Sequence, residues 1–211
     1  PMPRKMAYGD LLNYGYEKNV ILLQKIKAPA DLPSGAFLLK ADIEILVCQE
    51  ECIPEYGTYT LTLNGETGET DNKKYLDYAR TQIPLRVDWK ATAHQEGGNL
   101  ILKVTPSNRS IFKNLTPQMI EFFPLDWGVV KNASQAEVAF EDNQIVITQP
   151  RGDRPLSELK TTDIVIALGK GEGRLSYQTK ADVGATSHWQ AAEVDDLIEE
   201  ISTKASGGLF H

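Results

Sequence analysis

Two cysteines, Cys48 and Cys52, are the residues of this sequence best suited to do chemistry. Three residues separate them, and Pro54 follows two positions after the second. A disulfide needs its two Cα atoms within about 4.4–6.8 Å, so the intervening residues must form a tight turn if the pair is bridged. Such a bridge is either a structural clip in a hairpin or a centre of thiol–disulfide exchange, and the spacing alone leaves both readings open.

The short spacing itself bears on that choice. A bridge over so few residues closes a very small ring and gains little from loop-closure entropy, whereas the potential of a local, exposed disulfide is easily set by its neighbours. Glu50 and Glu51 lie inside the ring, where carboxylates raise the pKa of a thiol, unless both simply point into solvent. Pro54 fixes its own φ and limits how the loop relaxes when the bridge opens.

The elements that would position this pair are two strands. Residues 37–47 alternate loosely between apolar and other side chains and lead into Cys48, and residues 58–63 alternate Thr or Tyr with Leu on the return.

Upstream, residues 1–19 are rich in Tyr and Gly and indicate a loop whose aromatic side chains are available as cover. Residues 20–26 are a further strand candidate. Residues 73–82 carry apolar side chains at helical spacing and predict a short linking helix.

The rest of the chain is strand-rich. We expect a second all-β domain, an immunoglobulin-like β-sandwich, because short strands recur there without intervening helices. The expected strands are residues 85–93, 99–105, 119–123, 137–140, 144–148, 163–168 and 174–179. Residues 188–204 predict an acidic amphipathic helix that packs on its own domain or frays. The expected domains are therefore 1–70, which carries the cysteines, 71–184, the second sandwich, and 185–211, the helix and tail.

Composition excludes some classes of function. The chain has 211 residues and a net charge of −7, with a pI near 5.1, which argues against nucleic acid or an anionic membrane surface as the main partner. It has neither an apolar run of transmembrane length nor a signal sequence at its start, so we expect a soluble chain. The abrupt start at Pro1 indicates a mature fragment of something longer.

Other motifs carry little weight. The run from Gly169 to Gly173 has three glycines but not the spacing of a phosphate-binding loop, and a hairpin turn explains it better. The three histidines are scattered, without metal-ligand spacing. No cofactor is expected beyond a redox-active disulfide.

Several segments, taken together and in this order, resemble one protein family. They are the Tyr-Gly segments at residues 7–10 and 13–17, the Pro-bounded stretch at 28–33 and the Cys-x3-Cys-x-Pro turn at 46–54. The chain is similar to the periplasmic N-terminal region of the DsbD/ScsB membrane thiol:disulfide interchange proteins, closest to the ScsB (suppressor of copper sensitivity) branch. Residues 83–180, with Phe122-Phe123-Pro124, resemble the second β-domain of longer members less specifically.

The resemblance implies an immunoglobulin-like redox domain, a protein-disulfide reductase module of a bacterial inner-membrane protein. It would receive electrons from the membrane-embedded and thioredoxin-like parts of its own polypeptide and pass them to soluble periplasmic thioredoxin-fold proteins, including those of cytochrome c biogenesis. Cys52 would form the mixed disulfide and Cys48 would resolve it. Tyr8 and Gly9 fall where the family has a cap loop that shields the pair, with Tyr14 and Tyr16 as further cover.

The sequence departs from the family pattern in two respects and leaves two other functions open. Family members have further strands upstream of the cap loop, so edge strands here would be open to pairing with another chain. Without the membrane and thioredoxin-like parts, the fragment alone would not turn over. The alternatives are a binding module whose disulfide is a passive clip, and a copper-tolerance domain in which the thiolates, with Met2 and Met6, hold Cu(I).

Overall fold

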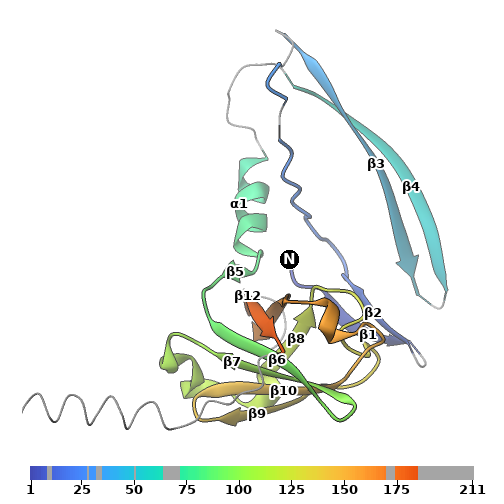
Figure 1. Ribbon diagram of the computed structural model, residues 1–211. Coiled ribbons are helices and arrows are strands. Elements are labelled where there is room, and N and C mark those ends of the chain that lie inside the picture. The colour runs from blue at the N-terminus through green and yellow to red at the C-terminus, as the bar shows by residue number, and fades with distance from the viewer. Residues whose placement is uncertain are drawn as a thin grey trace, which may run out of the picture. The chain divides into compact units, whose positions relative to one another are not determined.

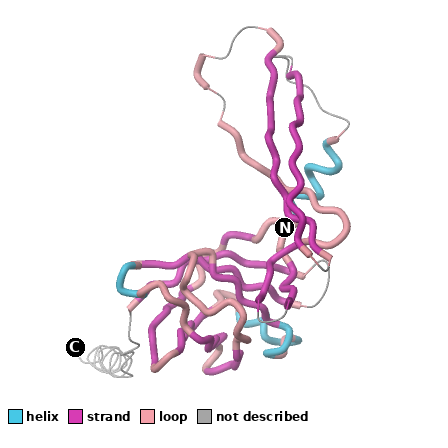
Figure 2. The backbone as a smooth tube through the Cα atoms, turned by 90° about the vertical axis from the view of Figure 1, so that its right-hand side faces the viewer, coloured by secondary structure: helices cyan, strands magenta, loops and turns pink. Residues whose placement is uncertain are grey.

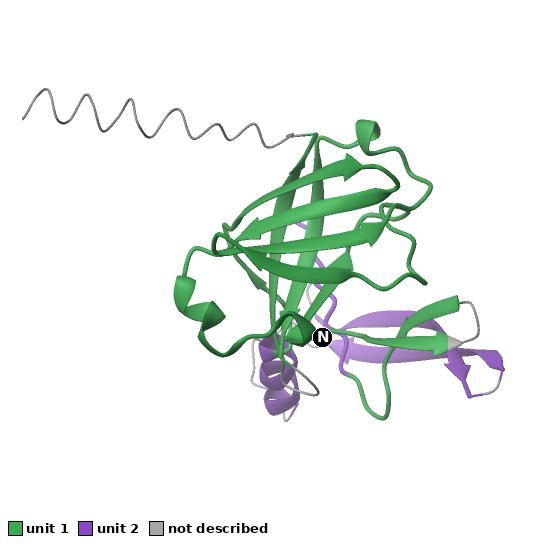
Figure 3. Cartoon of the chain, turned by 90° about the horizontal axis from the view of Figure 1, so that it is seen from below, with its two compact units in different colours: residues 1–20, 82–211 green, residues 21–81 purple. Residues whose placement is uncertain are grey.

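The structure is a computed structural model, and strands dominate it (Figure 1). It describes residues 1–8, 11–27, 29–31, 35–49, 51–63, 72–169 and 174–184. The chain divides into two compact units, coloured separately in Figure 3. Unit 1 comprises Pro1–Val20 and Gln82–His211, and unit 2 comprises Ile21–Thr81. The unit boundaries differ from the domain limits expected at residues 70 and 184, which stay predictions about the whole protein.

Unit 1 is built on one large sheet that curls over its own core. Its strands are β5 (Leu85–Arg86), β6 (Lys90–Glu96), β7 (Asn99–Thr105), β8 (Ile120–Pro124), β9 (Glu137–Glu141), β10 (Gln144–Pro150), β11 (Thr161–Leu168) and β12 (Leu175–Val183). They follow the order β8-β11-β12-β6-β7-β10-β9, with β5 beside β12. Neighbours are antiparallel except β12, which runs parallel to β5 and β6. Short 3-10 helices at Arg109–Asn114, Pro117–Met119 and Leu156–Glu158 join some of them.

The core of unit 1 comes from alternate residues of these strands. In β7, Leu100, Leu102 and Val104 are almost completely buried, and Ile164 and Ile166 of β11 face the same core. This period of two is what a strand gives when only one of its faces packs inward. Figure 3 shows how the sheet curves around this interior. The expected all-β, sandwich-like fold is therefore confirmed.

The outer face of this sheet carries a second, smaller apolar cluster of Phe123, Val165 and Ala167, on which Met2 packs. A short antiparallel hairpin, β1 (Arg4–Tyr8) with β2 (Leu11–Gly15), belongs to the same unit. The expectation of a loop over residues 1–19 was therefore wrong for this hairpin. The signal was present in the sequence: Tyr8 pairs with Leu11 and leaves only Gly9 and Asp10 between the strands, a spacing typical of tight hairpins.

Unit 2 contains a long antiparallel hairpin and one helix. Strand β3 (Phe37–Cys48) pairs with β4 (Cys52–Leu63) over twelve successive residue pairs (Figures 1 and 2). Helix α1 (Lys73–Thr81) confirms the predicted linking helix. Its first turn begins at Asn72, whose carbonyl accepts from the N–H groups of Tyr75 and Leu76, and the Thr81 hydroxyl donates to the Tyr78 carbonyl near its end.

The other strands predicted from the sequence are present where a neighbouring strand pairs with them. All seven strands expected between residues 85 and 179 are present, the first split into β5 and β6. The strand expected at residues 20–26 was wrong: among the residues that the structure describes, this segment pairs with no strand, and an isolated strand leaves its N–H and C=O groups unmatched. The helix expected at 188–204 lies outside the described residues. Within the described residues, no helix is long and apolar enough to cross a bilayer.

Candidate functional site

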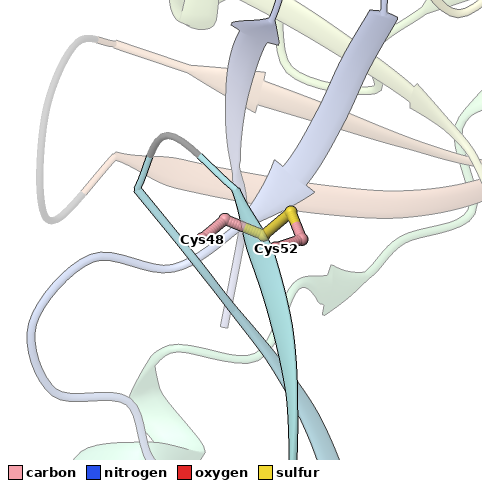
Figure 4. Close-up of a disulfide and its surroundings, with 2 residues drawn as sticks. All are labelled: Cys48 and Cys52. Atoms are coloured by element: carbon pink, nitrogen blue, oxygen red, sulfur yellow. A yellow bond between two sulfur atoms is a disulfide. The ribbon is translucent and has the colours of Figure 1, made fainter.

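Cys48 and Cys52 form a disulfide at the closed end of the β3–β4 hairpin (Figure 4). Cys48 is the last residue of β3, Cys52 is the first of β4, and the register places them directly opposite each other. Their Cα atoms are 4.1 Å apart, and both residues are exposed. The expected tight turn between the cysteines is therefore present.

Pro54 determines which kind of residue pair the disulfide joins. Opposed residues of an antiparallel hairpin alternate between pairs that exchange hydrogen bonds and pairs whose N–H and C=O groups point outward. Pro54 has no N–H, so the pair it forms with Leu46 is of the outward-pointing kind. Cys48 and Cys52 lie two positions further on and are of the same kind, in which Cα atoms approach to about 4.5 Å.

One further backbone hydrogen bond lies beyond the cysteines. The N–H of Gln49 donates to the carbonyl of Glu51 at 3.2 Å, outside the ladder, whose last pair is Cys48 and Cys52. The sulfur bridge therefore joins the last residue pair of the ladder, and this pair shares no backbone hydrogen bond. Opening it breaks no backbone hydrogen bond.

The hairpin has two chemically different faces, because side chains of opposed residues point to the same side and alternate along each strand. We call the first the cysteine face: it consists of Leu38, Lys40, Asp42, Glu44, Leu46, Cys48, Cys52, Pro54, Tyr56, Thr58, Thr60 and Thr62. We call the second the apolar face: it consists of Phe37, Leu39, Ala41, Ile43, Ile45, Val47, Ile53, Glu55, Gly57, Tyr59, Leu61 and Leu63. The disulfide thus lies on the polar side of the hairpin.

One polar cluster is well defined on the cysteine face. The hydroxyl of Thr58 donates to Oδ1 of Asp42 at 2.6 Å, and Nζ of Lys40 lies 3.1 Å from Oδ2 of the same carboxylate. The Thr58 hydrogen bond, and after it that of Lys40, lowers the pKa of Asp42 below its ordinary value. Asp42 therefore stays ionised on this face in mildly acidic solution.

The residues expected to modulate the cysteine loop are only partly described. Glu51 is exposed, and its carbonyl accepts the hydrogen bond from Gln49. Pro54 is exposed opposite Leu46. Glu50 lies outside the described residues, so its suggested effect on the thiols stays a prediction.

The residues expected to shield the cysteines belong to unit 1, apart from Gly9 and the Tyr8 side chain, which are not described. The ring of Tyr14 lies 5.9 Å from that of Phe123, and the Tyr16 hydroxyl donates to the carbonyl of Pro1 at 3.1 Å. Burial raises the pKa of both tyrosines. Each has a partner inside its own unit, and the shielding role stays a prediction.

The sequence did not predict a group of charged residues around Phe123. Nζ of Lys5 donates to the carbonyl of Phe122 at 2.8 Å and lies 4.7 Å from the centre of the Phe123 ring. The guanidinium of Arg174 lies 5.6 Å from that ring, pairs with Glu121 and donates to the carbonyl of Pro3. Burial, and then the charge of Arg174, lowers the pKa of Lys5. These contacts join residues at least 51 positions apart in the sequence, which no local pattern reveals.

The two methionines considered for copper have other contacts. Met2 packs on the Phe123 cluster, and the methyl group of Met6 lies against Gly15. Among the described residues, no three His, Cys, Asp or Glu side chains gather into a group that could hold a metal ion.

Comparison with protein-family models, curated proteins and solved structures finds no match to this chain.

Proposed function

We propose that the Cys48–Cys52 pair performs thiol–disulfide exchange with other proteins. The observation that carries the proposal is the position of the disulfide: it joins exposed residues at the tip of a hairpin, at the last pair of the ladder. A bridge there adds little stability, because the backbone hydrogen bonds of the hairpin already hold its two strands together. An attacking thiolate can approach the bridge from solvent. The resemblance to the DsbD/ScsB proteins supports the same chemistry.

The proposed cycle moves two electrons. A thioredoxin-like donor reduces the bridge and leaves two thiols. The thiolate of Cys52 attacks a disulfide of the acceptor protein, forms a mixed disulfide and releases one acceptor thiolate. The thiolate of Cys48 then attacks Sγ of Cys52, which re-forms the Cys48–Cys52 bridge and releases the second acceptor thiolate; both acceptor thiolates take up protons from solvent. No prosthetic group takes part.

The setting we propose for this exchange is the bacterial periplasm. There the domain would be one relay of a larger inner-membrane polypeptide, with soluble thioredoxin-fold proteins as acceptors and the thioredoxin-like domain of its own polypeptide as donor. This setting follows the family resemblance and accords with the net charge of −7, which does not favour nucleic acid as a partner.

Trapping of the mixed disulfide tests the proposal and the two cysteine roles. We expect reduced Cys48→Ser to accumulate a covalent adduct with an oxidised thioredoxin-fold acceptor, since the resolving thiol is missing. Cys52→Ser, the matched control, should give at least about tenfold less adduct on non-reducing gels, with every adduct released by dithiothreitol. The reverse pattern would exchange the two assignments.

The reduction potential of the folded chain separates exchange from a passive clip. A structural bridge typically has a potential below roughly −300 mV, whereas an exchanging pair lies above that value. We expect equilibration of the native chain with glutathione or a thioredoxin to place it above that limit. If donors reduce the bridge only after the chain is unfolded, the exchange proposal is wrong.

A further inference from the structure

The two faces of the β3–β4 hairpin differ in what a protein bonded to the cysteines would touch. Leu46 and Pro54 are opposed residues of the cysteine face, two positions from the bridge, which is about 7 Å along the strands. Leu46 is 65% exposed. Val47 is one residue nearer to the bridge and 51% exposed, but its side chain belongs to the apolar face. Leu46 and Pro54, unlike Val47, therefore lie on the same side of the hairpin as the sulfur atoms.

We propose that Leu46, Pro54 and Glu44 form the surface on which the acceptor protein docks during exchange. The inference rests on the proposed function and names the kind of partner that this site selects. The partner is a protein whose reactive disulfide has an apolar side chain beside it and a lysine or arginine further out. The surface lies wholly on the cysteine face of the hairpin.

The mixed disulfide itself determines what covers Leu46 and Pro54. A disulfide holds the two Cα atoms that it joins about 4.4–6.8 Å apart, so an acceptor bonded to Cys52 lies as close to it as a neighbouring strand would. Leu46 and Pro54 are about as far from the bridge and on the same side, so the acceptor surface covers them too. Apolar groups of the acceptor are favoured there, because contact removes the exposed Leu46 side chain from water.

The next pair along the cysteine face offers a charge and an aromatic ring. Glu44 lies opposite Tyr56, four positions and about 14 Å from the bridge, and Tyr56 is 73% exposed. An open hollow at this point is lined by Asp42, Ile43, Glu44, Tyr56, Gly57 and Thr58. A side chain of the acceptor can therefore enter the hollow while its cysteine is bonded to Cys52.

The ion pairs of the hairpin make Glu44 the carboxylate that is available for that side chain. Nζ of Lys40 lies 3.1 Å from Asp42, whereas none of the ion pairs in the described part of the chain includes Glu44. A lysine or arginine of the acceptor would pair with Glu44 and lie against the ring of Tyr56. An acidic side chain in the same place would be repelled by both carboxylates.

Three disulfides that share one component test both contacts on the reduced full chain. The first is hydroxyethyl disulfide, which is too small to reach beyond the bridge. The other two are extended peptides whose cysteine is joined to 2-mercaptoethanol, with leucine two residues further on and either lysine or glutamate four residues further on. Each reaction re-forms the Cys48–Cys52 bridge and releases two thiols, so two electrons pass to the probe disulfide. The second-order rate constant is measured for each probe.

The charge contact predicts a preference between the two peptides. We expect the lysine peptide to react at least about fivefold faster than the glutamate peptide at low salt, and the ratio to approach one at high salt. Glu44→Gln should also bring the ratio close to one. Glu55→Gln, the matched control, removes a carboxylate at a similar distance from the bridge on the apolar face and should keep the preference.

The apolar contact predicts a difference between neighbouring positions. Leu46→Ser should slow both peptides at least about threefold relative to hydroxyethyl disulfide, whereas Val47→Ser, on the other face, should change this relative rate by less than about twofold. Dividing each peptide rate by the rate with hydroxyethyl disulfide removes any effect of a variant on the pKa of the thiols. Amide spectra of each variant confirm that its hairpin is still formed.

The outcomes distinguish this inference from the exchange on which it rests. If the reduced chain reacts with all three probes but the variants of the two faces act alike, exchange stands and the docking surface is wrong. The same holds if the two peptides react equally fast at low salt. If the chain reacts with none of the probes, both the exchange and the docking surface are wrong.

Discussion

At the scale of single residues, the hydrogen-bond donors at individual positions determine the local structure of the β3–β4 hairpin. Pro54 lacks an N–H and thereby sets the alternation of the ladder, which in turn places the two cysteines at a pair that shares no backbone hydrogen bond. Asp42 and Thr58 form the next defined polar contact along the same face. Both features follow from residue identity at single positions of β4.

The Asp42 contact leads to a prediction about pH. Its pKa is lowered in the folded state, so its contribution to stability is present above the ordinary value of 3.8 and is lost as the pH falls through the lowered value. Thr58→Ala removes the main cause and should raise the pKa of Asp42 towards 3.8. Carboxylate chemical shifts followed by NMR during an acid titration measure this change. Thr60→Ala, on the same face, should leave it where it is.

At the scale of elements, the β1–β2 hairpin illustrates how distant contacts stabilise a short strand pair. Its strands have five residues each, too few to be stable alone, and Lys5 and Tyr14 connect it to Phe122 and Phe123 of β8. The hairpin is therefore part of unit 1 because of its side chains rather than its own ladder.

Lys5→Ala should consequently loosen this hairpin. We expect faster amide exchange over residues 4–8 and 11–15, by roughly tenfold, because a part-buried hydrogen bond and a cation–π contact are both lost. Hydrogen exchange read out by mass spectrometry or NMR measures it. Exchange in β7 should not change, and Lys25→Ala, at an exposed position, is the matched control.

The same elements show what the sequence could and could not predict. The strands of the large sheet of unit 1 and helix α1 were predictable, because alternation and helical spacing are local patterns that each segment carries by itself. The turn between Cys48 and Cys52 was predictable from the reach of a disulfide. The β1–β2 hairpin was missed although the two residues between its strands, Gly9 and Asp10, are a local hairpin signal; its contact with Phe123, far along the chain, is the part that no local pattern carries. Residues 20–26 were mistaken for a strand because apolar content does not say whether a partner strand exists.

At the scale of the whole molecule, stability and proposed chemistry lie in different units. The buried clusters of the described residues belong to unit 1, whereas the disulfide belongs to unit 2. The candidate site therefore belongs to a different unit from the one that holds these buried clusters.

Thermal unfolding tests this separation. Leu102 is completely buried, and Leu102→Ala should destabilise the main unfolding transition by about 2–5 kcal/mol through the cavity it leaves. Reduction of the disulfide should shift the same transition by less than about 1 °C. Calorimetry with and without dithiothreitol measures both effects. A large shift on reduction would show that the bridge supports the core after all.

The length of the β3–β4 hairpin has a consequence for encounters with partners. The sulfur atoms lie at the end opposite to Phe37 and Leu63, where the chain enters and leaves, and eleven steps of about 3.4 Å amount to roughly 37 Å of reach. The disulfide is thus carried at the end of a ribbon only two strands wide. For the proposed exchange, a tip of this width suits an acceptor whose own disulfide lies in a recess.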